Sequence, residues 1–172
     1  MSSAPDPFER LGVPAAFELD PAVLRERVIR LSLRLHPDRA PDPVTAELNT
    51  RELAAINEAA RVPENDERRA EALLALRGGP SASDDRTLPG GFLESILAVR
   101  MDLEHALSVG DEQGTATLEA WACDRRTSHG STVASLFDGK ESGLTAIRHE
   151  LNIWRYIERM IAQLRESDRG GV

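Results

Sequence analysis

Three consecutive residues, His36-Pro37-Asp38, hold an imidazole ring and a carboxylate together across a proline. An imidazole exchanges a proton near neutral pH and a carboxylate can accept one, so the pair is a candidate for acid–base chemistry. The same two groups can instead make hydrogen bonds and ion pairs with a partner protein. A histidine at the end of a helix is also favoured by the helix dipole without any further role. The surrounding elements must distinguish these interpretations.

The tripeptide is predicted to lie in the loop of a helical hairpin. Asp20-Pro21 is a typical helix start, and Pro37 ends a helix that begins there. Apolar residues spaced i, i+4, i+7 and i+11 give this helix one stripe, made of Leu24, Val28, Leu31 and Leu35. A second helix is predicted to start at Asp42-Pro43 and to end before Pro63, and it carries Leu48, Leu53, Ile56 and Ala60. Two such helices with a short loop form an αα-hairpin.

Five arginines lie on the first helix and beside the tripeptide, namely Arg25, Arg27, Arg30, Arg34 and Arg39. Arg27, Arg30 and Arg34 recur at helical spacing, about 100° around the helix from the apolar stripe. Although the chain as a whole carries a net charge of −8, these arginines create a local positive field that would steer an acidic partner. A solvated helix face without a partner is the alternative.

The remainder of the chain predicts further helices and one linker. Residues 64–77 are helical in pattern, whereas residues 78–91 are rich in Gly, Pro, Ser and Asp and indicate a linker. Residues 92–172 contain three longer amphipathic segments with short connections, which favours an antiparallel three-helix bundle. We therefore predict an all-α protein with an N-terminal helical-hairpin domain in residues 1–77, a linker in 78–91 and a bundle in 92–172.

The first bundle helix has two apolar stripes. One is made of Phe92, Ile96, Val99 and Leu103, and the other of Leu93, Leu97 and Met101. If one stripe faces the core and the other faces solvent, the exposed apolar patch marks a partner site. If both contact neighbouring helices, they form the wide apolar face that a bundle helix needs. The sequence leaves both possibilities open.

Several segments together resemble a J-domain, the module with which co-chaperones stimulate the ATPase of a DnaK-type chaperone. The matching segments are Asp6-Pro7-Phe8-Glu9-Arg10-Leu11-Gly12-Val13, His36-Pro37-Asp38-Arg39, Ala55-Ile56-Asn57-Glu58-Ala59 and Arg69-Ala70-Glu71. Three further segments extend the resemblance over essentially the whole chain: Phe17-Glu18-Leu19-Asp20, residues 69–76, and Phe92-Leu93-Glu94. With them, the chain is similar to the HscB family, the co-chaperones of iron–sulfur cluster biogenesis.

The resemblance implies two partners. An HscA-like chaperone would bind His36, Pro37 and Asp38 together with Arg25, Arg27, Arg30, Arg34 and Arg39. An IscU-like scaffold protein would bind Leu93, Leu97, Met101 and Tyr156. The chain departs from the family where Ala98, Met101 and His105 replace acidic residues beside those leucines. Ala60 also stands in place of an aromatic residue and Pro63 in place of a core leucine.

Composition limits the classes of ligand, compartment and activity that fit the chain. A net charge of −8 disfavours nonspecific binding to nucleic acid. The longest apolar run, Ala72 to Leu76, is too short for a membrane span and no secretory signal is recognised, so we expect a cytoplasmic protein. The single Cys123 and the spacing of the histidines match no metal motif, so we expect neither zinc nor a cofactor. We expect no enzymatic activity of its own.

Three alternatives stay open at this point. Instead of an HscB-like protein, the chain could be a co-chaperone of a general DnaK with another client or a structural adaptor with a degenerate J-like fold. The third alternative is a small hydrolase that uses His36 and Asp38.

Overall fold

The computed structural model describes residues 6–139 and 143–169. Within these ranges the chain forms seven α-helices and one short 3₁₀ turn and contains no strand, which confirms the predicted all-α class. Among the described residues, each helix is too short or too polar to cross a lipid bilayer. The chain divides into two compact units, residues 1–73 and residues 74–172.

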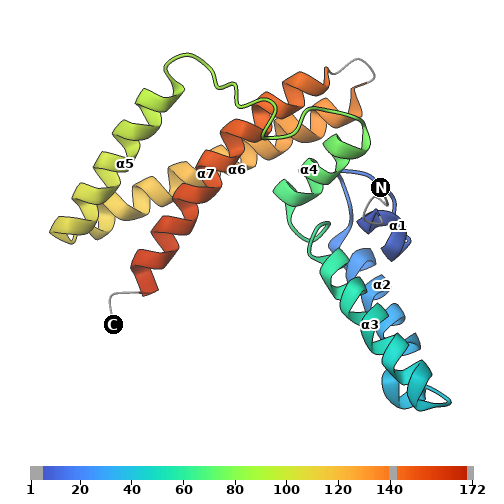
Figure 1. Cartoon of the computed structure of the whole chain (residues 1–172). Coiled ribbons are helices and arrows are strands. Elements are labelled where there is room, and N and C mark those ends of the chain that lie inside the picture. The colour runs from blue at the N-terminus through green and yellow to red at the C-terminus, as the bar shows by residue number, and fades with distance from the viewer. Residues whose placement is uncertain (1–5, 140–142, 170–172) are drawn as a thin grey trace. The chain divides into compact units, whose positions relative to one another are not determined.

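Unit 1 contains α1 (Pro7–Leu11), α2 (Pro21–Arg34), the 3₁₀ turn η1 (Pro37–Arg39), α3 (Pro43–Ala60) and most of α4 (Asp66–Leu76). Helices α1, α2 and α3 begin with the same device. An aspartate (Asp6, Asp20 or Asp42) accepts a backbone N–H bond as the N-cap, and a proline follows it at the first helical position. As Figure 1 shows, α2 and α3 lie side by side as the predicted hairpin.

The core of unit 1 is aliphatic, with one aromatic ring. Its buried side chains are Phe8, Leu11, Val13, Leu24, Leu31, Ile56, Ala60, Pro63, Ala70 and Leu73. Leu48, one of the apolar residues of α3, is exposed and does not join this core. The helical period places Asn49 on the inner face instead, where it is half-buried.

The turn between α3 and α4 is held by Arg69, a residue of the Arg69-Ala70-Glu71 motif. Arg69 is buried, and its Nη1 donates a hydrogen bond of 2.5 Å to the carbonyl oxygen of Pro63. Its Nη2 forms an ion pair of 2.6 Å with Asp66, and its guanidinium lies 5.1 Å from the ring centre of Phe17. These contacts replace the hydration of both Nη atoms, whereas Nε of Arg69 is buried without a hydrogen-bond partner among the described residues.

Unit 2 contains α5 (Phe92–Val109), α6 (Glu112–Asp138) and α7 (Leu144–Arg169). Figure 1 shows α6 and α7 running alongside each other, and α5 packs against α6. Buried residues from all three helices form one cluster: Ile96, Leu103, Ala122, Ile157, Met160 and Ile161. The three-helix layout agrees with the prediction. Gly110 ends α5 in the left-handed conformation that glycine adopts without strain.

The segment of residues 78–91 is fastened to α7 by side chains. Asn152, which is buried, donates from Nδ2 to the carbonyl oxygens of Asp85 and Thr87, each at 3.1 Å. Its Oδ1 accepts a hydrogen bond of 3.0 Å from Nε of the fully buried Arg148. Nε2 of His149 lies 3.0 Å from Oδ2 of Asp85. These bonds satisfy polar groups that burial would otherwise penalise, so the segment follows a defined path.

The division between the units falls inside α4. The domain boundaries that the sequence suggested, at residues 77 and 91, therefore stay predictions.

Candidate functional site

The tripeptide forms the tip of the hairpin. His36 is the N-cap of η1 in an extended conformation, and Pro37 occupies the first position of the turn, where its missing N–H is not needed. Nδ1 of His36 lies 3.3 Å from the backbone nitrogen of Asp38, which donates to it, and 3.7 Å from the Asp38 carboxylate. The two side chains are 52% and 86% exposed. Both are therefore presented to solvent at one end of unit 1.

This geometry fixes which atoms can contact a partner. When the His36 ring is neutral and its Nδ1 accepts the Asp38 N–H, the proton of the ring is on Nε2. Nε2–H is then a donor and the Asp38 carboxylate is an acceptor, one on each side of the rigid Pro37. Acid–base catalysis is most effective in a site that excludes bulk water, and these two side chains are largely exposed. The arrangement suits recognition of a protein surface.

The five arginines have different surroundings. Nε of Arg27 donates to the carbonyl oxygen of Leu11 at 2.6 Å, and its Nη2 lies where a Cβ on Gly12 would be only 2.6 Å away. Arg27 thus stabilises the end of α1, and Gly12 permits its approach. Nη1 of Arg39 donates to the carbonyl oxygen of Leu33, near the end of α2, at 3.1 Å. Arg27 and Arg39 are therefore engaged with the chain itself.

The other three arginines, Arg25, Arg30 and Arg34, are exposed on α2. Arg30 pairs with Glu26 one turn earlier in the helix, an exposed interaction that contributes little to stability. Between Pro21 and Arg39 the chain has five arginines and only two acidic residues, Glu26 and Asp38. The segment from α2 to the loop therefore carries a net positive charge, although the whole chain is acidic.

An exposed apolar pair on α2 escaped the sequence analysis. Ile29 and Leu33 lie one turn apart and are 52% and 58% exposed. Helical spacing places them on the outward face of α2, between Arg25 on one flank and Arg30 on the other. The i, i+4 spacing of two large apolar residues outside the buried stripe was the available clue. The outer face of α2 thus combines positive charge with apolar area.

Asp42 shapes the segment just after the loop. Its carboxylate accepts bonds from the hydroxyl and the backbone N–H of Thr45, at 2.6 and 2.9 Å. The Thr45 hydroxyl, followed by its backbone N–H, holds the pKa of Asp42 below its ordinary value. The charged cap fixes where α3 starts and so limits the length of the loop.

On α5 the structure distinguishes the two apolar stripes. Ile96 and Leu103 are buried, whereas Leu93, Leu97 and Met101 are 52%, 59% and 62% exposed. We call these three side chains the α5 stripe. Because they form a contiguous apolar strip on one helix face, they are candidates for a partner site and do not build the core.

Tyr156 lies on α7 and borders α5. Its ring meets that of Phe92 edge to face with 5.7 Å between the ring centres. Phe92 and Tyr156 are both half-buried, so their exposed edges lie near the start of the α5 stripe. The replaced positions Ala98, Met101 and His105 are all exposed, and none carries a negative charge.

The candidate residues therefore separate into two groups. The tripeptide and the arginines lie in unit 1, and the α5 stripe and Tyr156 lie in unit 2.

Curated proteins named co-chaperone protein HscB homolog are similar to this chain in sequence. The protein of Aliivibrio salmonicida is 32% identical over 109 residues, which is 62% of this chain and 64% of that protein. The protein of Shewanella frigidimarina is 32% identical over 111 residues, with 63% and 64% covered. The protein of Acinetobacter baumannii is 33% identical over 101 residues, with 59% and 57% covered. The chain thus matches less than two thirds of the length of these relatives. No protein-family model matches it.

Solved structures share the fold over nearly the whole chain. Chaperone HscB from Vibrio cholerae has a TM-score of 0.82 at 20% identity, covering 98% of this chain and all of that one. Human co-chaperone protein HscB has the same TM-score and identity, covering 98% of this chain and 84% of the human one. The similarity therefore includes both units and not the hairpin alone.

Proposed function

We propose that this chain, which is similar to curated HscB homologues in sequence and shares the fold of HscB structures, is a co-chaperone that stimulates the ATPase of a specialised, HscA-like chaperone of the DnaK type. Residues of unit 1 bind the chaperone. The bundle of unit 2 binds an IscU-like scaffold protein and delivers it for iron–sulfur cluster maturation. The observation that carries the proposal is the exposed His36-Pro37-Asp38 turn at the end of a basic helix.

The chaperone contact is supported by charge and by shape. Complementary charge steers two proteins together, and the exposed Arg25, Arg30 and Arg34 supply the positive side. The apolar pair Ile29 and Leu33 adds area that desolvates on contact. Such a mixture of exposed arginines and aliphatic side chains is what a protein surface needs to bind an acidic partner in one orientation.

The tripeptide acts without transferring a proton. Nε2–H of His36 donates a hydrogen bond to the chaperone, Asp38 accepts one or pairs with a cation, and Pro37 makes the backbone between them rigid. ATP hydrolysis accelerates when this contact is stronger in one conformation of the chaperone than in the other. The catalytic groups then belong to the chaperone, and the chain itself has no turnover.

The client contact is supported by the α5 stripe. Leu93, Leu97 and Met101 offer apolar area that no described residue covers, and Tyr156 adds an aromatic edge. An apolar centre with a partly polar border is the usual composition of a protein–protein interface.

The chaperone assignment is tested by measuring steady-state ATPase while the protein is titrated into a purified HscA-like chaperone or a general DnaK. We expect stimulation of the HscA-like chaperone, and roughly tenfold or greater loss of it in His36→Gln, as for an interface hot spot. His105→Gln, an exposed histidine on α5, is the matched control and should stimulate normally. Stimulation of DnaK alone would favour the general co-chaperone. Turnover of a substrate without any chaperone would support a hydrolase instead.

One observation favours a second client. Since Ala98, Met101 and His105 reduce the negative charge beside the α5 stripe, where Glu94 and Glu104 remain exposed, a scaffold with a less basic surface than IscU also fits the stripe. Binding of purified scaffold proteins to the full chain, compared at low and high salt, separates these clients.

A further inference from the structure

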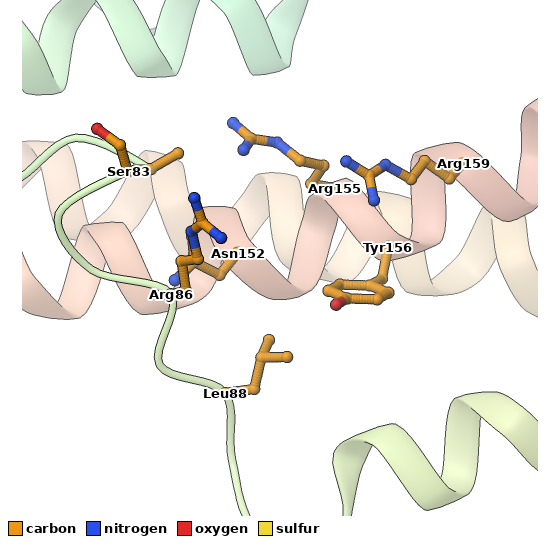
Figure 2. A pocket seen from close by; sticks show the side chains of 8 residues that line it. Ser83, Arg86, Leu88, Asn152, Arg155, Tyr156 and Arg159 are labelled. Carbon is orange, nitrogen blue, oxygen red and sulfur yellow. The ribbon is translucent and has the colours of Figure 1, made fainter.

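A pocket of about 500 Å³ lies in unit 2 between the segment 82–88 and α7. Three arginines line it: Arg86 from the segment, and Arg155 and Arg159 from α7. In Figure 2 the Arg86 side chain extends from the segment toward α7, the Arg155 side chain extends from α7 toward the side of Ser83, and the Arg159 side chain ends beside Tyr156. We call this feature the arginine pocket. The proposed chaperone contact does not use it.

The arginine pocket is preformed because its outer wall is fastened to α7. Asn152 holds the backbone of the segment through the carbonyl oxygens of Asp85 and Thr87. The ion pair between His149 and Asp85 adds a second attachment. Arg86 lies between these two fastened residues in the sequence, so it cannot move far from α7. A preformed site loses less conformational entropy when a ligand binds.

The pocket concentrates positive charge in an acidic protein. None of the eight described residues that line it is acidic, although the chain has a net charge of −8. Asp84 and Asp85 are close in sequence but do not line the pocket. Hydrogen bonds from Ser81 lower the pKa of Asp84 and those from Thr87 lower the pKa of Asp85, so both carboxylates are charged and are held by residues outside the lining. Guanidinium groups that line one pocket are attracted to an anion placed between them.

The remaining walls suit a small organic molecule. The Leu88 side chain and the ring of Tyr156 are apolar, whereas Ser83 contributes a hydroxyl group. The guanidinium of Arg159 lies 5.8 Å from the ring centre of Tyr156, which holds it at the pocket. The volume falls within the range of about 300–1,000 Å³ that small-molecule sites occupy. The net negative charge of the chain disfavours nucleic acid.

We propose that the arginine pocket binds a small organic anion that carries two or more phosphate or carboxylate groups. Planar guanidinium groups bind both kinds of oxyanion with paired hydrogen bonds, so the chemistry is shared by organic phosphates and polycarboxylates. Leu88 and Tyr156 would contact the carbon skeleton. This inference does not depend on the proposed function, because the lining residues lie outside the α5 stripe. Only Tyr156 is shared with the proposed client contact.

The test is a titration of the ¹⁵N-labelled full chain with pyrophosphate, and separately with citrate, at constant ionic strength. We expect saturable shifts of the backbone amides in residues 82–88 and 152–159 with at least one of the two. Loss of one charge-assisted contact should weaken binding roughly tenfold, both in Arg86→Gln and in Arg159→Gln. Both side chains are exposed, so the variants should fold.

Arg100→Gln is the matched control, because Arg100 is an exposed arginine of α5 outside the pocket. It should bind the anions as the unchanged protein does. The pyrophosphate and citrate titrations distinguish the two chemical sources. The proposal is overturned if neither anion saturates, or if Arg100→Gln weakens binding as much as the pocket variants. A short acidic peptide that binds these residues more tightly than both anions would also overturn it.

Discussion

Replacing Leu97 with Gln should separate partner binding from folding. Leu97 is 59% exposed, while its neighbour Ile96 is 6% exposed and packs in the core cluster. Glutamine has a helix propensity close to that of leucine, so the backbone of α5 should not change. We expect the free energy of unfolding to stay within about 0.5 kcal/mol of the original value.

The loss in client affinity follows from the exposed fraction of the side chain. Full burial of a leucine contributes about 1.5–3 kcal/mol. A partner that covers the 59% still exposed on Leu97 would gain about 0.9–1.8 kcal/mol from it. Leu97→Gln should therefore weaken binding of the scaffold protein roughly five- to twentyfold. The same treatment of Leu93, 52% exposed, gives a similar loss, so the double variant should bind roughly 20- to 300-fold more weakly.

Isothermal titration calorimetry with the purified scaffold measures the affinity, and urea unfolding measures the stability. Ile96→Ala is the internal comparison and should lower the free energy of unfolding by about 2–4 kcal/mol, since it leaves a cavity. If Leu97→Gln bound the scaffold within twofold of the original protein, the α5 stripe would not be the client site. If it destabilised the fold as Ile96→Ala does, the stripe would belong to the core.

Three further results are expected. Arg27→Gln should lower the free energy of unfolding by about 1–3 kcal/mol in urea titrations, because it removes the bond to the Leu11 carbonyl; equal stability would mean that this contact is negligible. Asn152→Ala should speed hydrogen exchange of the amides in residues 80–90, measured by mass spectrometry, with little change in α2. Because the pKa of Asp42 is lowered in the folded state, acidification should reduce the free energy of unfolding. The stabilisation by the charged carboxylate is complete above the unfolded-state pKa of about 4 and is lost as the pH drops through the lower folded-state pKa. Asp42→Asn should flatten that part of a urea-unfolding profile recorded between about pH 5 and about pH 2.5.

Much of the fold follows from local chemistry that a sequence displays. The Asp-Pro pairs at residues 6–7, 20–21 and 42–43 are typical of helix starts, and each aspartate is the N-cap of a helix in the structure. The glycines at residues 110 and 139 mark where α5 and α6 end. These signals are readable because a cap depends on residues within one turn of it.

Features that depend on distant contacts were not predictable in this way. The segment 78–91 has the composition of a flexible linker, yet Asn152 and His149, more than sixty residues away, hold it on α7. Arg27 belongs by spacing to a solvated basic stripe, but the carbonyl of Leu11 engages it. In both cases a side chain with several donors finds a backbone partner that no periodicity reveals.

The candidate site was also predictable only where it depends on local sequence. Periodicity identified both stripes of α5, but only the packing of α5 in the bundle could decide which one is exposed. The arginine pocket was missed because its members come from a presumed linker and from the last helix. Ala60, which stands in place of an aromatic residue, and Pro63, which stands in place of a leucine, are both buried. Smaller side chains therefore complete this part of the unit 1 core.

The most direct test of the account is the ATPase rate of the HscA-like chaperone with the protein added, in the presence and absence of the scaffold. Three proteins are compared: the original chain, His36→Gln and Leu97→Gln. The account predicts that His36→Gln fails to stimulate in either condition, whereas Leu97→Gln stimulates normally alone and loses only the additional effect of the scaffold. Normal stimulation by His36→Gln would contradict the central claim that the exposed tripeptide of unit 1 activates the chaperone.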